Sequence, residues 1–203
     1  MLTVPRTHTL RTLREENSRL KDENLTLREE LIRLQHIISA LNNLQQSLDS
    51  ITPDTRIQAL LNNLLAAVLE AVDSQDGSLQ LLDEEKQELV FVEVQGSSRG
   101  PLLGYRLPVS QGIAGWVVTH RTPELVPDVY QEPRFSPLVD QTTGFHTSSL
   151  ICVPLLTGER TLGAIEVVNT RSGAPFTKKD LEVLELVARM ATAALLRAES
   201  VGN

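Results

Sequence analysis

Leucine recurs at every seventh position through the first fifty residues, at Leu13, Leu20, Leu27, Leu34, Leu41 and Leu48. A companion row three residues earlier holds Leu10, Asn17, Asn24, Leu31, Ile38 and Gln45. These rows are the d and a positions of a heptad repeat. A helix that only packs on its own domain would not need so strict a repeat. The pattern therefore predicts a dimeric coiled coil over residues 8–51.

Polar residues in and beside this seam predict that the two helices run parallel. Asn17 and Asn24 at successive a positions would each bury an amide, which lowers stability and favours an in-register parallel dimer. Glu16 at a g position would face Lys21 at an e position of the second helix, and the next heptad repeats this pairing. Such exposed pairs are worth only a few tenths of a kcal/mol and mainly set orientation. We expect a parallel homodimer.

The charge distribution excludes a DNA-binding basic zipper. That class needs a strongly basic helix directly before the leucine repeat to neutralise phosphates. Residues 1–12 carry only Arg6 and Arg11 as basic side chains besides one histidine, with Pro5 next to them. The whole chain has a formal net charge of -7. We therefore expect no nucleic-acid partner.

Residues 52–203 read as a second unit, framed by two helices. Thr52 is a suitable N-cap and Pro53 a suitable first residue for a new helix, although a kinked continuation of the coiled coil is the alternative. Apolar residues at helical spacing then run from residue 57 to residue 72. Near the end, Thr177 followed by Asp180 is an acidic variant of a capping box before another apolar helical row. Both helices offer a core face or a dimer face.

Strand-like segments lie between these two helices: Ser78–Leu82, Leu89–Gln95, Tyr105–Val109, Glu124–Val126, Leu150–Leu156 and Leu162–Val168. Gly112 and Gly115 allow a close turn into a short helix. A hydroxyl-rich stretch, residues 130–149, follows as a long loop, and loops of that length are typically lids or binding loops. The pattern predicts an α+β fold with one long loop over a site.

Composition narrows the cellular setting. The chain has 203 residues with 41% apolar and 22% charged side chains, which is typical of soluble globular proteins. No run of about 18 apolar residues predicts a membrane span, and the N-terminus lacks the pattern of a signal peptide. Cys152 is the single cysteine, which excludes an internal disulfide framework. We expect a cytoplasmic protein with no membrane partner.

Candidate chemistry is sparse. Cys152 lies in an apolar strand, where an inert buried thiol is expected rather than a nucleophile. Glu166 shares a strand face with Ala164 and Val168, and an unpaired carboxylate there would cost several kcal/mol. It should meet a ligand, water or a neighbouring protein donor. His146 is a lone loop histidine, and no metal-ligand spacing appears. We expect neither a metal nor an enzyme.

Residues 78–196 resemble a GAF domain. The segments that carry the resemblance are 112–117, 126–130, 140–147, 150–155 and 163–169. The resemblance implies a central antiparallel sheet flanked by helices on one side, with a ligand pocket on the other side under the long loop. Within the family the pattern is similar to the regulatory domains of cyclic-nucleotide phosphodiesterases and bacterial adenylyl cyclases, and to bacterial signalling proteins. It therefore implies a small-molecule ligand, with cyclic nucleotides as one class.

The resemblance also implies a set of pocket positions. The residues that match it are Ser78, Ile113, Ala114, Asp140, Thr143, Thr147 and Glu166. Ser136 falls where the family has an aromatic residue, which would remove a ring contact with a purine. Val94 and Gln95 fall where the family has an aromatic residue and an aspartate, which weakens base recognition.

A clamp that is diagnostic of the cyclic-nucleotide branch is only partly present. Asn169, Phe176 and Asp180 match it. Thr170 replaces the lysine that would bridge to the aspartate, and Leu181 replaces a glutamate. Arg171 is the remaining candidate for the bridge. The partial clamp makes a cyclic nucleotide one candidate among several.

These observations predict a non-catalytic sensory module. It would bind a small molecule as a homodimer and signal through helix packing to a downstream signalling protein. The alternative is a dimerisation or scaffold protein whose pocket is empty or vestigial.

Overall fold

The computed structural model describes residues 6–49 and 57–201 of the chain. Internal contacts divide it into two compact units, Met1–Ile38 and Ser39–Asn203. The predicted boundary between residues 51 and 52, including the proposed cap at Thr52 and Pro53, lies outside the described residues and stays a prediction. The described helices lack the length or the apolar character that crossing a membrane requires.

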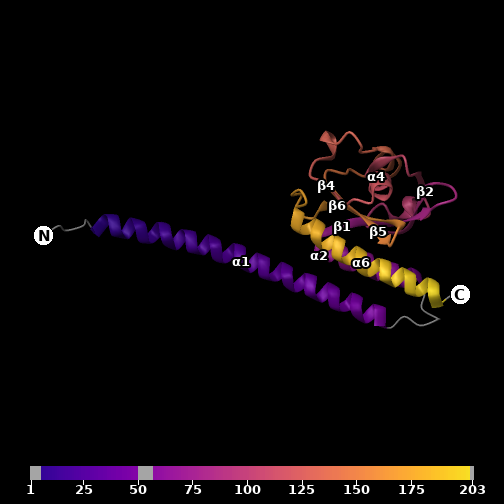
Figure 1. The fold of residues 1–203 in the computed structure, drawn as a ribbon. Helices are drawn as coiled ribbons and strands as arrows, with labels where there is room; N and C mark the ends of the chain where they lie inside the picture. Colours follow the sequence, from indigo (N-terminus) through magenta and orange to yellow (C-terminus); the bar gives the residue numbers. More distant parts are fainter. Residues whose placement is uncertain (1–5, 50–56, 202–203) are drawn as a thin grey trace. The chain divides into compact units, whose positions relative to one another are not determined.

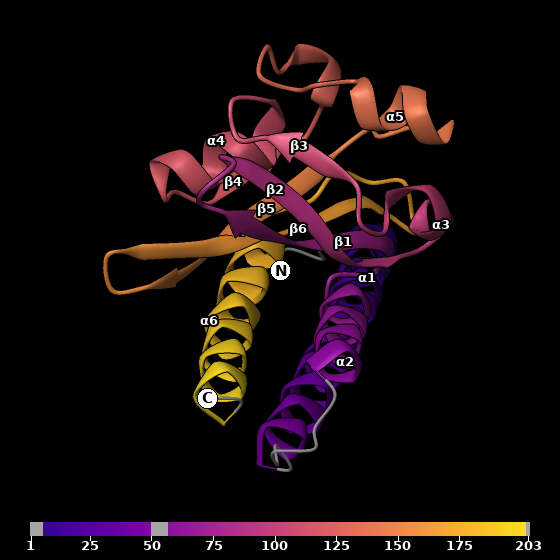
Figure 2. The same ribbon diagram turned by 90° about the vertical axis from the view of Figure 1, so that its right-hand side faces the viewer.

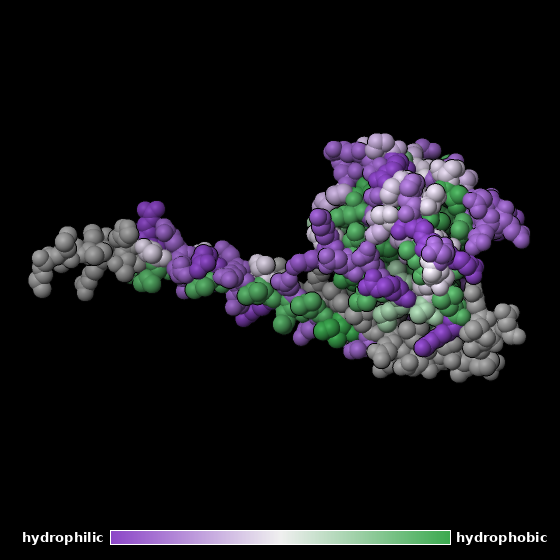
Figure 3. All heavy atoms as spheres, viewed as in Figure 1, coloured by the Kyte–Doolittle hydropathy of each residue, from purple (hydrophilic) through white to green (hydrophobic). Residues whose placement is uncertain are grey.

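Helix α1, Arg6–Asp49, is one uninterrupted helix of 44 residues (Figure 1). Its seam residues are exposed by 51% to 60%: Leu10, Leu13, Leu20, Leu27, Leu31, Leu34 and Ile38. Apolar side chains recur along an otherwise hydrophilic helix in Figure 3. Its polar face carries ion pairs within the helix, Arg11 with Glu15 and Arg19 with Glu16. The predicted helix is confirmed over these residues, whereas its pairing with a second copy stays a prediction.

The second unit is built on a six-stranded sheet in the order β3-β2-β1-β6-β5-β4. Every pair of neighbouring strands is antiparallel. The strands are β1 Ser74–Asp83, β2 Glu88–Gln95, β3 Arg106–Pro108, β4 Glu124–Val126, β5 Leu150–Thr157 and β6 Arg160–Thr170. Each of the strand-like segments in the sequence became a strand, and the α+β fold class is confirmed.

Two helices cover one face of this sheet, α2 Ile57–Ala71 and α6 Lys178–Val201, and they lie side by side in Figure 2. Leu64 and Leu65 of α2 and Leu184 of α6 are fully buried. At the start of α6, the Asp180 carboxylate accepts hydrogen bonds from the backbone N–H and the hydroxyl of Thr177. The apolar faces of both helices therefore contribute to the core of the unit itself.

Short helical segments lie over the opposite face (Figure 2). They are α3 Arg99–Leu102, α4 Gly112–His120, the 3-10 turn η1 Val129–Gln131 and α5 Leu138–Thr143. The expectation of one long irregular loop over residues 130–149 was thus too simple, because η1 and α5 lie within it. Gly144 in a left-handed conformation ends α5 and turns the chain toward β5.

Gly115 lets α4 pack closely on the segment before it. A Cβ atom added at Gly115 would lie 2.3 Å from the carbonyl oxygen of Val109. We expect Gly115→Ala to lower the free energy of unfolding by about 1–3 kcal/mol, because the backbone must move to relieve this overlap. Urea denaturation measures the change. Gly100→Ala is the control, since an added Cβ there meets nothing within 4 Å; an equal loss in both variants would contradict the packing argument.

Candidate functional site

A cavity of about 90 Å³ lies between the sheet and the segments that cover its second face. Its wall comes from the central strands β1, β2 and β6, from the first turn of α4, and from α5 and its flanking residues. One water needs roughly 10–15 Å³, so this space accommodates a small molecule. It is smaller than the roughly 300–1,000 Å³ of drug-sized pockets.

The floor of the cavity is polar where β1 meets β6. Ser78 on β1 lies directly across from Glu166 on β6, and Cys152 on β5 flanks Glu166 from the other side. Gln80, two residues after Ser78, is 1% exposed and its amide Nε2 donates to Ser78 Oγ at 3.1 Å. The Gln80 Oε1 atom is buried without a hydrogen-bond partner in the described structure. Such an unpaired acceptor costs about 1–3 kcal/mol.

Glu166 is the second unpaired group at the cavity wall. Its carboxylate accepts no hydrogen bond and forms no ion pair with any residue that the structure describes. Burial raises the pKa of Glu166 from 4.5 to about 7, and the negative charge of Asp140 adds to this shift. The half-buried carboxyl group is therefore near its titration midpoint at neutral pH. Of the three partners expected for Glu166, a neighbouring protein donor is not found among the described residues.

Asp140 lies on α5 and stabilises the long loop beside the cavity through hydrogen bonds. Its Oδ2 accepts the backbone N–H of Thr147, and its Oδ1 accepts the Thr147 hydroxyl, both at 2.8 Å. Thr147 is 4% exposed. Both carboxylate oxygens thus hold the loop in place while the charge of Asp140 remains next to the cavity.

Aromatic rings complete the wall. Phe91, Phe135 and Phe145 all line the cavity, and Phe91 packs edge-on against Tyr105 with ring centroids 6.3 Å apart. Ser136, where the family has an aromatic residue, also lines the cavity. The expected loss of a ring contact with a purine at that position stays a prediction. The three phenylalanines supply aromatic surface elsewhere on the wall.

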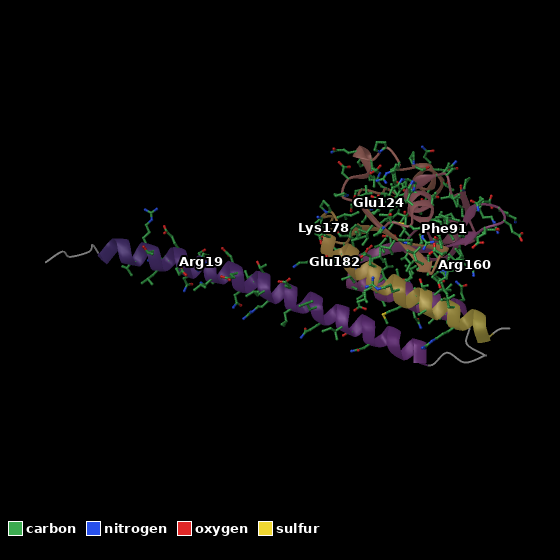
Figure 4. All side chains as sticks on the ribbon, viewed as in Figure 1. Arg19, Phe91, Glu124, Arg160, Lys178 and Glu182 are labelled. Carbon is green, nitrogen blue, oxygen red and sulfur yellow. The ribbon has the colours of Figure 1, made fainter. Side chains whose placement is uncertain are left out.

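A surface cluster around Arg134 holds the loop next to Phe135. The Arg134 guanidinium pairs with Glu124 on β4 at 2.9 Å and with Glu132 at 2.8 Å, and it lies 4.4 Å from the centre of the Trp116 ring on α4. Glu124 lies on the upper part of the second unit in Figure 4. The hydrogen bond from Arg134 lowers the pKa of Glu132 to about 2. These contacts link β4, α4 and the loop to one another.

Most of the residues predicted for the pocket line this cavity: Ser78, Ile113, Ala114, Ser136, Asp140, Thr147 and Glu166. Thr143 does not line it. The Thr143 hydroxyl donates to the carbonyl oxygen of Val139 and accepts the N–H of Phe145, so it stabilises the end of α5. Which of these residues contact a ligand stays a prediction.

The three clamp positions make separate local contacts. The Asn169 side chain accepts the N–H of Ser148 and donates to the carbonyl oxygen of His146, which joins the end of β6 to the long loop. Asp180 caps α6 through Thr177, and Phe176 is 3% exposed in the core. Arg171, the candidate for the missing bridge, lies 3.9 Å from Asp73.

Sequence reasoning missed Gln80 and Phe91. Strand alternation alone could have found Gln80, because it lies two residues after Ser78 and therefore on the same face of β1. Phe91 required the register of β1 and β2, which places it across from Gln80 beside a β-bulge. That register has no clear signal in the single sequence.

The chemistry of nucleophiles and metals has little support in this site. Cys152 is fully buried, and burial with the nearby charges of Glu166 and Glu124 raises the pKa of its thiol well above its usual value. A thiol in that state is a poor nucleophile. The described residues contain no group of three or more His, Cys, Asp or Glu side chains placed to hold a metal ion.

A family model described as the GAF domain matches residues 56–195. The chain belongs to the GAF family. A dual 3',5'-cyclic-AMP and -GMP phosphodiesterase 11A from Takifugu rubripes is 32% identical over 146 residues, which cover 67% of this chain. The same alignment covers 16% of that protein, so this chain spans only a small part of the length of its relative.

Solved structures share the GAF fold at low sequence identity. The GAF domain of an Acinetobacter phosphoenolpyruvate-protein phosphotransferase is 20% identical with a TM-score of 0.68, covering 82% of this chain and 97% of that one. A free methionine-R-sulfoxide reductase from Neisseria meningitidis, solved with its substrate, is 23% identical with a TM-score of 0.65. That alignment covers 81% of this chain and 92% of the reductase chain. The resemblance to a GAF domain and the predicted GAF fold are both confirmed.

Proposed function

We propose that this chain is a non-catalytic sensory GAF module that binds a small molecule in the cavity on its sheet. The observation that carries the proposal is the buried Gln80 Oε1 atom, which has no hydrogen-bond partner in the described structure and lies at the cavity wall with the partly buried Glu166 carboxylate. Buried polar groups without partners are costly, and a bound molecule with hydrogen-bond donors would relieve that cost. A scaffold with a vestigial pocket would be expected to fill the space with its own side chains.

We also propose that the chain does not catalyse thiol chemistry, because its cysteine is single and buried. The similar Neisseria meningitidis structure is a reductase of free methionine sulfoxide, a thiol chemistry that needs a second cysteine to resolve the first. Cys152 is the one cysteine of this chain and is fully buried. A buried thiol in the neutral form supports a structural role for it.

The proposal further includes a parallel homodimer in the cytoplasm, formed through the exposed leucine row of α1. In the second unit, strands β1 and β6 carry the pocket floor on one face and contact α2 and α6 with the other. A ligand that shifts these strands would bias the packing of the two helices. Coupling of this kind needs an element with two arrangements that both sites influence, and the helices are our candidate for it. A downstream signalling protein would read the change.

Cyclic nucleotides are the first ligands to test, because the Takifugu rubripes relative is a phosphodiesterase of cyclic AMP and cyclic GMP. A ligand present at about 100 times its dissociation constant stabilises the folded state by about 2.7 kcal/mol. For a chain of this size that corresponds to a rise in Tm of roughly 5–10 °C. The panel should extend to amino acids, amines and organic acids, with mass spectrometry of any small molecule that co-purifies.

A cavity-filling variant tests whether the binding site is this cavity. We expect Ala114→Leu to abolish the ligand-induced rise in Tm, because Ala114 lines the cavity and the larger side chain would occupy it. Ala66→Leu is the matched control, since Ala66 is exposed on α2. A chain that shows no stabilisation by any compound and carries no co-purified molecule would favour the scaffold alternative.

A further inference from the structure

The ionisable side chains that line the cavity are all acidic. They are Asp76, Asp140 and Glu166, and no Lys, Arg or His is found among the described residues of the wall. Asp76 already accepts the N–H of Ser97 at 3.0 Å, and Asp140 already accepts two hydrogen bonds from Thr147. Of these three carboxylates, Glu166 is thus the one that accepts no hydrogen bond from a described residue. An anionic ligand would enter a field of like charge.

We propose that the pocket takes a compact organic cation, an ammonium group on a small apolar body, with its N–H donors directed at Glu166 and Gln80. This inference rests on the proposed function and specifies its ligand class. An ammonium group has donors and no acceptor, which matches a site whose free groups are acceptors. Bound between Glu166 and Asp140, it would also neutralise the repulsion between these two carboxylates.

Gln80 supports the same class independently of charge. Its Oε1 atom is an acceptor without a partner in the described structure, and the side chain is 1% exposed at the cavity wall. The amide nitrogen is already engaged with Ser78. A ligand that offers only acceptors would leave Oε1 unpaired, whereas an N–H donor would satisfy it.

The apolar part of the wall fits the body of such a ligand. Phe91, Phe135 and Phe145 line the cavity, and the faces of aromatic rings attract cations within about 6 Å of the ring centre. The cavity of about 90 Å³ favours a compact molecule.

The first turn of α4 is a feature of the wall that would favour an anion. Gln111, Gly112 and Ile113 line the cavity at the start of this helix. The N-terminus of a helix carries roughly half a positive charge, which is less than the combined charge of Asp140 and an ionised Glu166. The balance of the site is therefore negative, and the cation is favoured.

Matched compounds of one size test the ligand class. Saturation-transfer NMR on the full chain would compare n-butylammonium, n-butanol and butyrate, with cyclic AMP and cyclic GMP alongside. We expect n-butylammonium to bind saturably and at least tenfold more tightly than n-butanol, with butyrate weakest. In Glu166→Gln the affinity for n-butylammonium should fall about tenfold, and Asp140→Asn should weaken it as well.

Glu182→Gln is the matched control. Glu182 is exposed on α6 (Figure 4), and its substitution removes the same charge at a position away from the cavity. Unchanged binding in that variant separates a local role of Glu166 from the net charge of the chain. Binding of butyrate or a cyclic nucleotide without n-butylammonium would overturn the ligand class while leaving the sensory function intact. If none of these compounds nor the wider metabolite panel binds, both proposals fail.

Discussion

Glu166→Gln is expected to stabilise the ligand-free chain at about pH 8 by up to about 3 kcal/mol, and to change its stability little near pH 4. The pKa of Glu166 is raised from 4.5 to about 7 in the folded chain by burial and by Asp140. Ionising this carboxyl group therefore costs more in the folded state than in the unfolded state. Glutamine keeps the shape of the side chain and removes that cost.

The direction of the pH dependence follows from proton binding. Below the unfolded pKa of 4.5, both states hold the proton and Glu166 contributes no difference. Between 4.5 and about 7 the folded state keeps a proton that the unfolded state has released, so the stability falls as pH rises. Above about 7 both states are ionised and the full penalty remains.

Urea denaturation of the wild type and Glu166→Gln across this pH range measures the effect. The gain should appear between about pH 5 and pH 7 and then level off. Glu182→Gln should shift stability only slightly and without that midpoint, because this side chain is exposed. A gain in Glu166→Gln that is equal at all pH values would show that the carboxyl group does not titrate as described.

The double variant Leu20→Asp with Leu27→Asp is expected to convert the chain from dimer to monomer at micromolar concentration. Both leucines are more than half exposed on α1 in the single chain, and the heptad repeat places them in the dimer seam. Each buried leucine contributes about 1.5–3 kcal/mol, and the dimer would lose four of them. Because every 1.4 kcal/mol is a tenfold change, we expect the dissociation constant to rise at least a thousandfold.

Light scattering coupled to size exclusion reads the result directly. The matched control is Ser18→Asp with Thr26→Asp, which adds the same charge at b and c positions outside the seam. That variant should remain dimeric. A wild-type chain that is monomeric would contradict the coiled coil. A dimer that survives in the seam variant would instead place the interface on another surface.

Periodic burial explains which elements were predictable from the sequence. The helix α2 was predicted because its apolar residues recur at helical spacing. The strands β5 and β6 were predicted because each contains a short, nearly continuous apolar run, which is typical of a strand buried on both faces. The helix α5 was missed for the converse reason. It has six residues, Pro137 at its N-cap makes no side-chain capping bond, and none of its residues is buried. It therefore leaves neither a capping signal nor an apolar period.

The candidate site was predictable in part for a related reason. Glu166 was found because a polar residue on an apolar strand stands out in the sequence, and Ser78 was found because it matches a pocket position of the GAF resemblance. The partner that faces such a residue depends on the register between strands, and the pairing of Ser78 with Glu166 was visible only in the fold. Phe135 and Phe145 lie in the long loop, where their direction is set by contacts such as the Arg134 cluster and the Asp140–Thr147 bonds.

Strand β6 separates the cavity from the helical layer by the thickness of a single backbone. Glu166 and Val168 line the cavity, while Ile165 and Val167 alternate with them toward α2 and α6 and are at most 1% exposed. On that side Gly77, opposite Val167, packs so closely that an added Cβ would come within 2.9 Å of Leu69 in α2. A close-packed interior transmits small displacements because it has no empty space to absorb them. A change in the occupancy of the cavity or in the protonation state of Glu166 would therefore act on a strand whose opposite face packs directly against the helices.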